Sequence, residues 1–129
     1  MARLFETGAI LILCSPIASM ANAQTFQMEC RFENFIRTTS QGVDSGEVFW
    51  KVIMAHTRTS GRVVVDGSGD YKAKAKSFAS GAIEYKFNTD VSDEVITVGP
   101  TGEALWDIRF DGGDILVYTG ECNEQRRTD

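Results

Sequence analysis

One C-terminal segment, residues 94–122, constrains the fold more than any other part of the chain. It contains three short runs rich in β-branched and aromatic residues, and it ends in a cysteine. The runs are separated by residues 99–102 (GPTG) and 111–114 (DGGD), and such glycine- and proline-containing connections are typical of tight turns. The pattern therefore predicts a three-stranded antiparallel meander.

The chain before this meander carries further segments with β-type patterning. Residues 25–35 place apolar side chains at even-numbered positions and polar ones between them, as expected of a half-buried strand. Residues 47–57 include apolar side chains at both odd- and even-numbered positions. This pattern predicts a strand covered on both faces, with a short amphipathic helix as the weaker alternative. Further strands are expected at residues 62–66, 71–79 and 83–88.

Polar stretches between these segments predict the connections. Residues 37–46 (RTTSQGVDSG) are predicted to form a loop, and the polar tail at residues 123–129 is expected to fray. The chain thus offers about eight strands and no long helix, at the spacing of an all-β domain. We expect a single antiparallel β-sandwich or small β-barrel of about eight strands, and the sequence leaves both architectures open.

Residues 1–23 have the features of a secretory signal peptide. Arg3 supplies a positive start, and residues 8–17 form an apolar run shorter than the roughly 20 residues that a membrane-spanning helix needs. The segment ends in the small-x-small sequence ANA, so cleavage is expected after Ala23. Residues 24–129 would then form one all-β domain that is periplasmic or secreted.

Cys14 leaves a second interpretation of this N-terminal segment. The sequence LILC at residues 11–14 resembles a lipobox, although Leu13 is larger than the small residue that normally precedes the modified cysteine. The alternative to plain secretion is therefore an uncleaved or lipid-anchored form. No other association with a membrane is expected.

The charge of the chain limits its possible partners. The formal net charge at pH 7 is −5, and an acidic surface repels the phosphates of nucleic acids and of anionic lipid headgroups. We therefore expect no nucleic-acid partner. An unknown protein or a small ligand is the expected partner class.

Cys30 and Cys122 lie near the two ends of the expected mature domain. In a compartment that permits disulfides they are predicted to pair. In the chain-entropy model, closing a loop of this length contributes roughly 4–5 kcal/mol, less any strain. A reactive or metal-binding thiol is the alternative, but neither cysteine belongs to a Cys-x-x-Cys motif or stands beside a histidine.

The residue types needed for common catalytic sites are scarce. His56 is the single histidine of the chain, and no pattern of zinc ligands surrounds it. A serine triad would need this same histidine. We therefore expect a protein without enzymatic activity, metal or cofactor; a hydrolase built on scattered carboxylates is the remaining catalytic alternative.

One short segment has part of a calcium-binding pattern. Asp66, Ser68 and Asp70 have the 1, 3, 5 spacing of a calcium loop. Tyr71 stands where that loop needs glycine, and Ser77 stands where it needs a bidentate glutamate. A hairpin turn with solubilising aspartates is the better interpretation.

Three lysines form the most distinctive surface pattern in the sequence. Lys72, Lys74 and Lys76 alternate with smaller or aromatic residues, which gives the expected strand one cationic face. Such a face could bind an acidic partner or a polyanion. Lysines also protect edge strands from pairing with other molecules, and edge protection or plain solvation is the preferred interpretation.

Trp50 and Trp106 are expected to be core residues. If the fold is a barrel, a tryptophan at its mouth could instead line a site for a sugar or an apolar ligand.

The chain resembles a loose group of short exported bacterial proteins of uncharacterised function. The resemblance rests on the signal peptide, on Cys30 in the first strand and on the C-terminal sequence VGPTGEALWDIRF…GDILVYTGEC. The resemblance covers most of the mature chain. It implies an exported, cysteine-bracketed all-β domain, and it implies no ligand because the shared positions are turns and core residues.

A weaker resemblance is to the periplasmic inhibitors of C-type lysozyme, which are small disulfide-linked β-barrels. The sequence ASGA at residues 79–82 with Tyr85 is similar to their Ser-Gly-x-x-Tyr loop, with the tyrosine one residue late. The resemblance implies that the Ser80-Gly81 loop enters the enzyme cleft and that Tyr85 supports it. The second motif of that family, a lysine followed shortly by glycine, is missing.

Taken together, these patterns predict an exported, non-catalytic binding or interaction protein. Two more specific alternatives are an inhibitor of a lysozyme-type lytic enzyme and a barrel that binds a small ligand. They differ in the site that they require, because the first uses the Ser80-Gly81 loop and the second uses a cavity beside Trp50 or Trp106.

Overall fold

The computed structural model describes residues 25–127, which contain nine β-strands and no helix. Consequently, no helix in this range is long and apolar enough to cross a membrane. The predicted signal peptide and Cys14 lie outside the described residues. The strands are β1 (Phe26–Thr39), β2 (Gly42–His56), β3 (Ser60–Val65), β4 (Gly69–Ser77), β5 (Ile83–Asn88), β6 (Ser92–Val98), β7 (Glu103–Phe110), β8 (Ile115–Cys122) and β9 (Arg126–Arg127).

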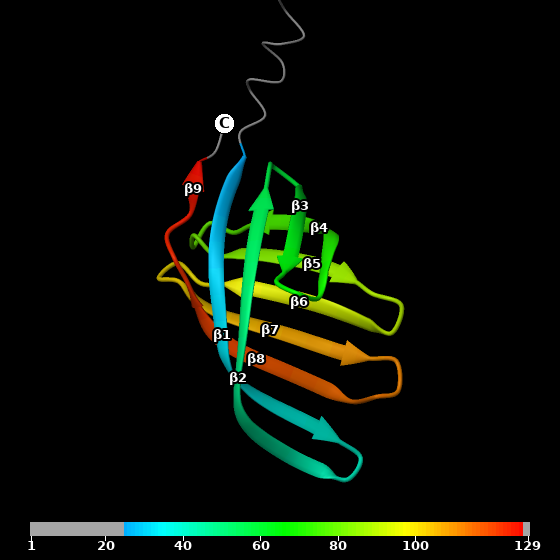
Figure 1. The fold of residues 1–129 in the computed structure, drawn as a ribbon. Coiled ribbons are helices and arrows are strands. Elements are labelled where there is room, and N and C mark those ends of the chain that lie inside the picture. Colours follow the sequence, from blue (N-terminus) through cyan, green and yellow to red (C-terminus); the bar gives the residue numbers. More distant parts are fainter. Residues whose placement is uncertain (1–24, 128–129) are drawn as a thin grey trace, which may run out of the picture.

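The first eight strands form a closed antiparallel barrel (Figure 1). Each strand from β2 to β8 pairs with its neighbours in the sequence, and β1 pairs with both β2 and β8. Because β1 is hydrogen-bonded on both sides, the sheet closes on itself, and the part of β2 before Val52 pairs with β1 alone. The structure therefore decides in favour of the barrel over the sandwich.

The barrel core follows from the two-residue period of the strands. Inward positions on β1 and β2 include Phe32, Val52 and Met54, which are completely buried, while the residues between them face outward. A barrel of about eight strands encloses just enough space for side chains to fill or for one small ligand. Other buried members of this core are Met28, Val63, Ala75, Ile83, Ile96, Val98 and Ala104.

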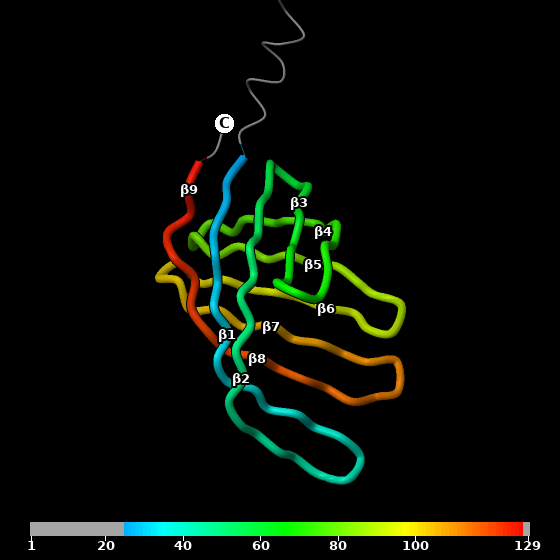
Figure 2. The backbone as a smooth tube through the Cα atoms, viewed as in Figure 1, coloured from blue at the N-terminus to red at the C-terminus, as the bar shows by residue number. Residues whose placement is uncertain are grey.

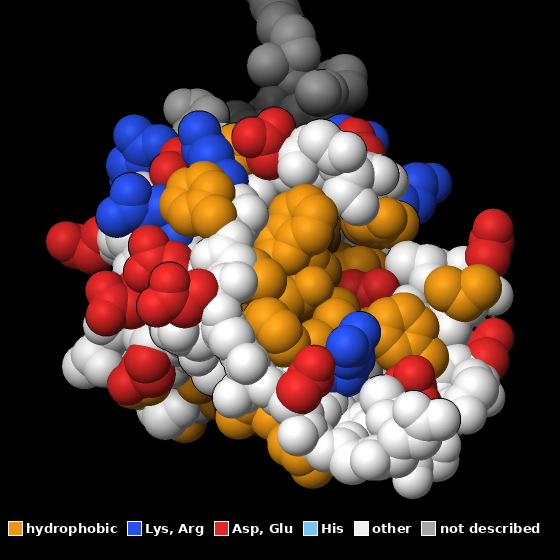
Figure 3. Space-filling model, turned by 60° about the horizontal axis from the view of Figure 1, so that its bottom comes forward, with side chains coloured by type: hydrophobic (Ala, Val, Ile, Leu, Met, Phe, Trp, Pro, Cys, Tyr) orange, Lys and Arg blue, Asp and Glu red, His pale blue; other side chains and the backbone are white. Residues whose placement is uncertain are grey.

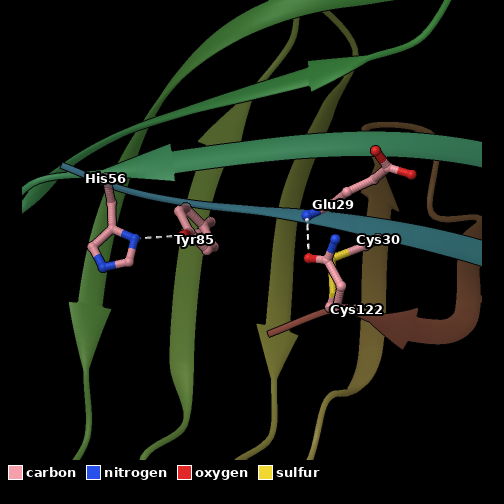
Figure 4. The surroundings of a disulfide bond; sticks show 6 residues. Glu29, Cys30, His56, Tyr85 and Cys122 are labelled. Carbon is pink, nitrogen blue, oxygen red and sulfur yellow. Dashed lines mark hydrogen bonds between the residues drawn. A yellow bond between two sulfur atoms is a disulfide. The ribbon is translucent and has the colours of Figure 1, made fainter. Parts of the chain in front are cut away.

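The predicted disulfide between Cys30 and Cys122 is confirmed, and it lies where β1 closes the barrel against β8. The two cysteines are direct cross-strand partners, with their Cα atoms 3.9 Å apart. Beside them, the backbone N–H of Glu29 donates to Oδ1 of Asn123 (Figure 4). In addition, the N–H of Asn123 donates to the carbonyl of Glu29. This group of contacts ties the C-terminal segment to the first strand.

The register of β1 shifts between Phe32 and Asn34 against both of its neighbours. Gly120 of β8 lies opposite Phe32 at this irregularity. A Cβ atom at Gly120 would overlap the carbonyl oxygen of Arg31 and crowd the Cα of Phe32. Glycine is required here because the two backbones approach too closely for any side chain.

The predicted loop at residues 37–46 is wrong. β1 continues to Thr39 and β2 begins at Gly42, so this segment is the end of a long hairpin with a tight turn. The hairpin extends beyond the barrel wall beside β8 (Figure 2), where Thr38 pairs with Ile115. The segment is polar because much of this extension is exposed, and it forms strands because β1 finds backbone partners on both β2 and β8.

Two further expectations are corrected. β2 is covered on one face only: Val52 is fully buried, whereas Phe49 on the outer face is 63% exposed.

The C-terminal tail was expected to fray from residue 123, but β9 pairs with Phe26 and Gln27 at the start of β1. Backbone hydrogen bonds therefore order part of a tail that has no apolar residues to bury.

We expect Gly120→Ala to lower the free energy of unfolding by about 3 kcal/mol or more, as strong overpacking does. The reason is the overlap between the new methyl group and the backbone of β1. The measurement is urea unfolding followed by circular dichroism. Gly112→Ala is the matched control, since no atom lies within 4 Å of its Cβ position; equal stability of the two variants would contradict the close approach.

Replacing both Cys30 and Cys122 by serine removes the covalent link across the barrel closure. With a sequence separation of 92 between the cysteines, we expect a loss of about 4 kcal/mol in the free energy of unfolding. The same urea experiment on the wild type under reducing conditions should give a similar loss. Unchanged stability in both cases would show that the disulfide contributes nothing to the barrel.

Candidate functional site

One end of the barrel, at the bottom of Figure 1, is hollow. Figure 3 shows hydrophobic side chains gathered around a hollow at this end. The hollow is a cavity of about 150 Å³, which we call the mouth cavity. Its wall is made mainly by Trp50, Tyr71, Trp106, Phe110, Leu116 and Tyr118.

Strand alternation brings these side chains together. On β7, Trp106, Ile108 and Phe110 share the inward face, and on β8 Leu116 and Tyr118 do so. The aromatic rings pack in a row, with Trp106 and Tyr118 centroids 5.0 Å apart and Trp50 and Tyr118 centroids 6.4 Å apart. Such tilted and edge-on contacts stabilise the wall, so the cavity is bounded by a preformed aromatic surface.

A carboxylate also lines this aromatic cavity. Glu94 of β6 is 8% exposed and belongs to the wall of the mouth cavity. Its Oε1 accepts a hydrogen bond from Nε1 of Trp106 at 2.8 Å, and its Oε2 accepts one from the hydroxyl of Ser92 at 2.8 Å. The Ser92 hydroxyl in turn contacts that of Thr89 at 2.7 Å. These contacts hold the carboxyl group in a fixed orientation.

The structure places Trp50 and Trp106 in the wall of the same cavity, as the barrel-mouth alternative requires. They also have core contacts: Trp106 is 5% exposed and packs edge-on against Phe32. The sequence interpretation missed Glu94. A signal was present, because Glu94 has the same parity as the apolar Ile96 and Val98 on one short strand.

Lys72, Lys74 and Lys76 lie on the exposed outer face of β4, as predicted. The edge-protection interpretation is wrong, because β4 pairs with β3 on one side and β5 on the other. Lys74 lies directly opposite Lys86 of β5, and like charges in that position destabilise a sheet. Solvation or binding of an acidic partner by these lysines stays a prediction.

The Ser80-Gly81 loop connects β4 and β5 at the opposite end of the barrel. Both residues are exposed, and Gly81 adopts a positive φ of 97°. The loop borders a groove of about 610 Å³ that is open to solvent and is bounded mainly by connections and by the C-terminal segment. This groove is larger than the mouth cavity, but its wall includes no buried charged side chain.

The expected role of Tyr85 at the surface needs correction. Tyr85 is completely buried inside the barrel, and its hydroxyl lies 2.6 Å from Nδ1 of His56 (Figure 4). It therefore cannot contact a partner at the surface. Strand parity explains the difference, since Tyr85 shares the inward face of β5 with Ile83 and Phe87.

His56 and Tyr85 form a buried polar pair. His56 is 5% exposed and stacks on Phe26, with ring centroids 5.5 Å apart. Burial lowers the pKa of His56 and raises the pKa of Tyr85, because both charged forms lose hydration. The pair satisfies two polar groups inside the apolar barrel.

Asp66, Ser68 and Asp70 lie at the β3–β4 hairpin turn. The backbone N–H of Ser68 donates to the carbonyl of Val65, and Asp70 forms a 3.0 Å ion pair with Arg62. The predicted hairpin turn is therefore confirmed. Within residues 25–127, no group of three or more histidine, cysteine or acidic side chains is placed to hold a metal ion.

The chain was compared with protein-family models, with curated proteins and with solved structures, and none of the three comparisons gives a match. The site must therefore be judged by its own geometry and chemistry.

The buried His56 should make the protein sensitive to acid. Its pKa is lowered on folding from an ordinary value of 6.5, so the unfolded chain binds a proton more readily than the folded one. The His56 contribution to stability is thus complete above pH 6.5 and is lost as the pH falls through the folded-state pKa, with a slope of up to about 1.4 kcal/mol per pH unit.

Urea unfolding of the wild type and of His56→Gln between pH 5 and 7.5 tests this expectation. Glutamine keeps a polar partner for Tyr85 but does not titrate, so its stability should fall less steeply below pH 6.5. Parallel curves for the two proteins would show that His56 does not cause the acid sensitivity.

Proposed function

We propose that this protein is an exported, non-catalytic binding protein that holds part of a small ligand in the mouth cavity of its barrel. One observation carries the proposal: an aromatic cavity of about 150 Å³ with a single oriented carboxylate stands at one end of the barrel core. Ligand sites are commonly concave and apolar, with few polar groups that orient the ligand.

The contrast between the two halves of the barrel supports this proposal. Around Phe32, Val52 and Met54 the side chains are fully buried and fill the interior. Around Trp50 and Tyr118 the side chains are only partly buried. Interiors are normally close-packed, so large aromatic residues that leave a hollow need an explanation other than stability.

The disulfide supports an extracytoplasmic location. Bonds such as Cys30–Cys122 form and persist mainly in oxidising compartments. Together with the expected signal peptide at residues 1–23, it supports export to the periplasm or beyond. A binding protein at this location would meet its ligand outside the cytoplasm.

The chemistry of the mouth cavity supports binding over catalysis. Glycoside hydrolysis, the catalytic alternative raised by the sequence, uses two carboxyl groups that flank the scissile bond. Among the residues that line the cavity, Glu94 is the only acidic side chain. It is held by a tryptophan N–H and a serine hydroxyl, which orient it, and none of the described residues that line the cavity is a histidine.

Tryptophan fluorescence tests whether the cavity admits a ligand. The chain has two tryptophans, and both line the cavity. We expect titration with 3,3-dimethylbutan-1-ol, a small neutral probe, to change the emission with a Kd in the millimolar range, as suits so few heavy atoms.

Leu116→Phe should weaken binding of this probe about tenfold, because the larger side chain occupies part of the cavity. Leu105→Phe is the matched control, since Leu105 is 43% exposed on the outer face of β7. Equal affinities of the probe for the two variants would show that it does not enter the mouth cavity and would overturn the proposed function.

A further inference from the structure

The buried carboxyl group of Glu94 has neutral neighbours. Its two hydrogen-bond donors are the indole N–H of Trp106 and the hydroxyl of Ser92, neither of which carries a charge. In the part of the chain from residue 25 to residue 127, none of the lysine–carboxylate or arginine–carboxylate pairs includes Glu94. The protein therefore supplies orientation to this group, but no countercharge.

This arrangement costs stability unless something compensates it. A buried carboxylate is normally paired with a cation, because two neutral donors replace only part of its lost hydration. Lys72, Lys74 and Lys86 border an open surface pocket of about 500 Å³ that Glu94 also lines, but none of them forms an ion pair with its carboxyl group. A positive group that enters the mouth cavity would supply the missing charge.

The wall around Glu94 suits one kind of positive group. Trp50, Tyr71, Trp106 and Tyr118 present aromatic rings to the same cavity, and aromatic rings attract cations through their electron-rich faces. A primary ammonium would need three hydrogen-bond acceptors, and each carboxylate oxygen of Glu94 already accepts one hydrogen bond. A quaternary ammonium needs none, and its methyl groups match the apolar surface.

The size of the mouth cavity and the net charge of the protein both suit a ligand that carries a quaternary ammonium group. A cavity of about 150 Å³ is comparable to one that admits benzene, so it has room for a trimethylammonium group but not for a drug-sized molecule. The rest of the ligand would extend out of the open end. The net charge of −5 also favours the approach of cations from solution.

We propose that the mouth cavity binds small molecules through a quaternary ammonium group, with Glu94 as countercharge and the tryptophan and tyrosine rings as the surrounding wall. This inference rests on the proposed function and specifies the ligand class of that same site. It assigns Glu94 a binding role, which its hydrogen bonds to Ser92 and Trp106 prepare by fixing the carboxyl group.

The test compares choline with 3,3-dimethylbutan-1-ol, in which a carbon atom replaces the positively charged nitrogen. Both are titrated into the folded wild-type protein while tryptophan emission is recorded. The two probes have nearly the same shape, so any difference in affinity reports the charge. We expect choline to bind at least about tenfold more tightly.

Glu94→Gln separates the charge from the shape of the site. Glutamine can still accept the hydrogen bond from Trp106, so we expect choline affinity to fall about tenfold while affinity for the neutral probe is unchanged. Glu121→Gln is the matched control, because it removes the same charge from an exposed position on β8; its choline affinity should equal that of the wild type.

Trp50→Leu provides an independent variant if Glu94→Gln does not fold, as judged by circular dichroism. Leucine keeps an apolar side chain but removes one ring, so choline should lose more affinity than the neutral probe. Equal wild-type affinities for the two probes would overturn the cation inference and leave the proposed function intact. Failure of both probes to bind would overturn both.

Discussion

The pairing of β1 with β8 is the interaction on which the rest of the structure depends. β2 to β8 form a simple antiparallel meander, and without this last pairing both ends of the sheet would be open. β1 closes the sheet through a register that places Cys30 opposite Cys122 and brings Gly120 against the backbone of Arg31 and Phe32. A covalent bond and a residue without a side chain thus stabilise the same seam, and closure encloses one continuous interior.

That interior is used differently at its two ends. At the end near the disulfide, the polar residues His56 and Tyr85 satisfy each other, and connections and the C-terminal segment bound an open groove. At the other end, aromatic rings and Glu94 surround a cavity. Replacing Glu94 by an apolar residue would be a simpler way to build a stable barrel, because buried charges without a countercharge are unfavourable. A local arrangement that is poor for stability but well ordered is typical of a binding site.

Two errors in the sequence interpretation have the same physical cause. Residues 37–46 were predicted to form a loop because they are polar, and edge protection was one of the two preferred interpretations of Lys72, Lys74 and Lys76, beside plain solvation. In the barrel, the hairpin residues find backbone partners on β8 as well as on each other, and β4 has a neighbour on both sides. In both cases the outcome depends on strand pairing between segments that are distant in the sequence. The residue types along one segment do not reveal which other strands it will pair with.

The sequence by itself determined the all-β class, the approximate positions of most strands, the turns of the C-terminal meander and the pairing of the two cysteines. These properties follow from local alternation, glycine-containing turns and the small number of cysteines available. Only the tertiary structure decided that the sheet closes, that Tyr85 points inward to His56, and that Glu94 shares a cavity with Trp50 and Trp106. Strand alternation specifies which residues share a face, whereas barrel closure determines which of those faces meet across the interior.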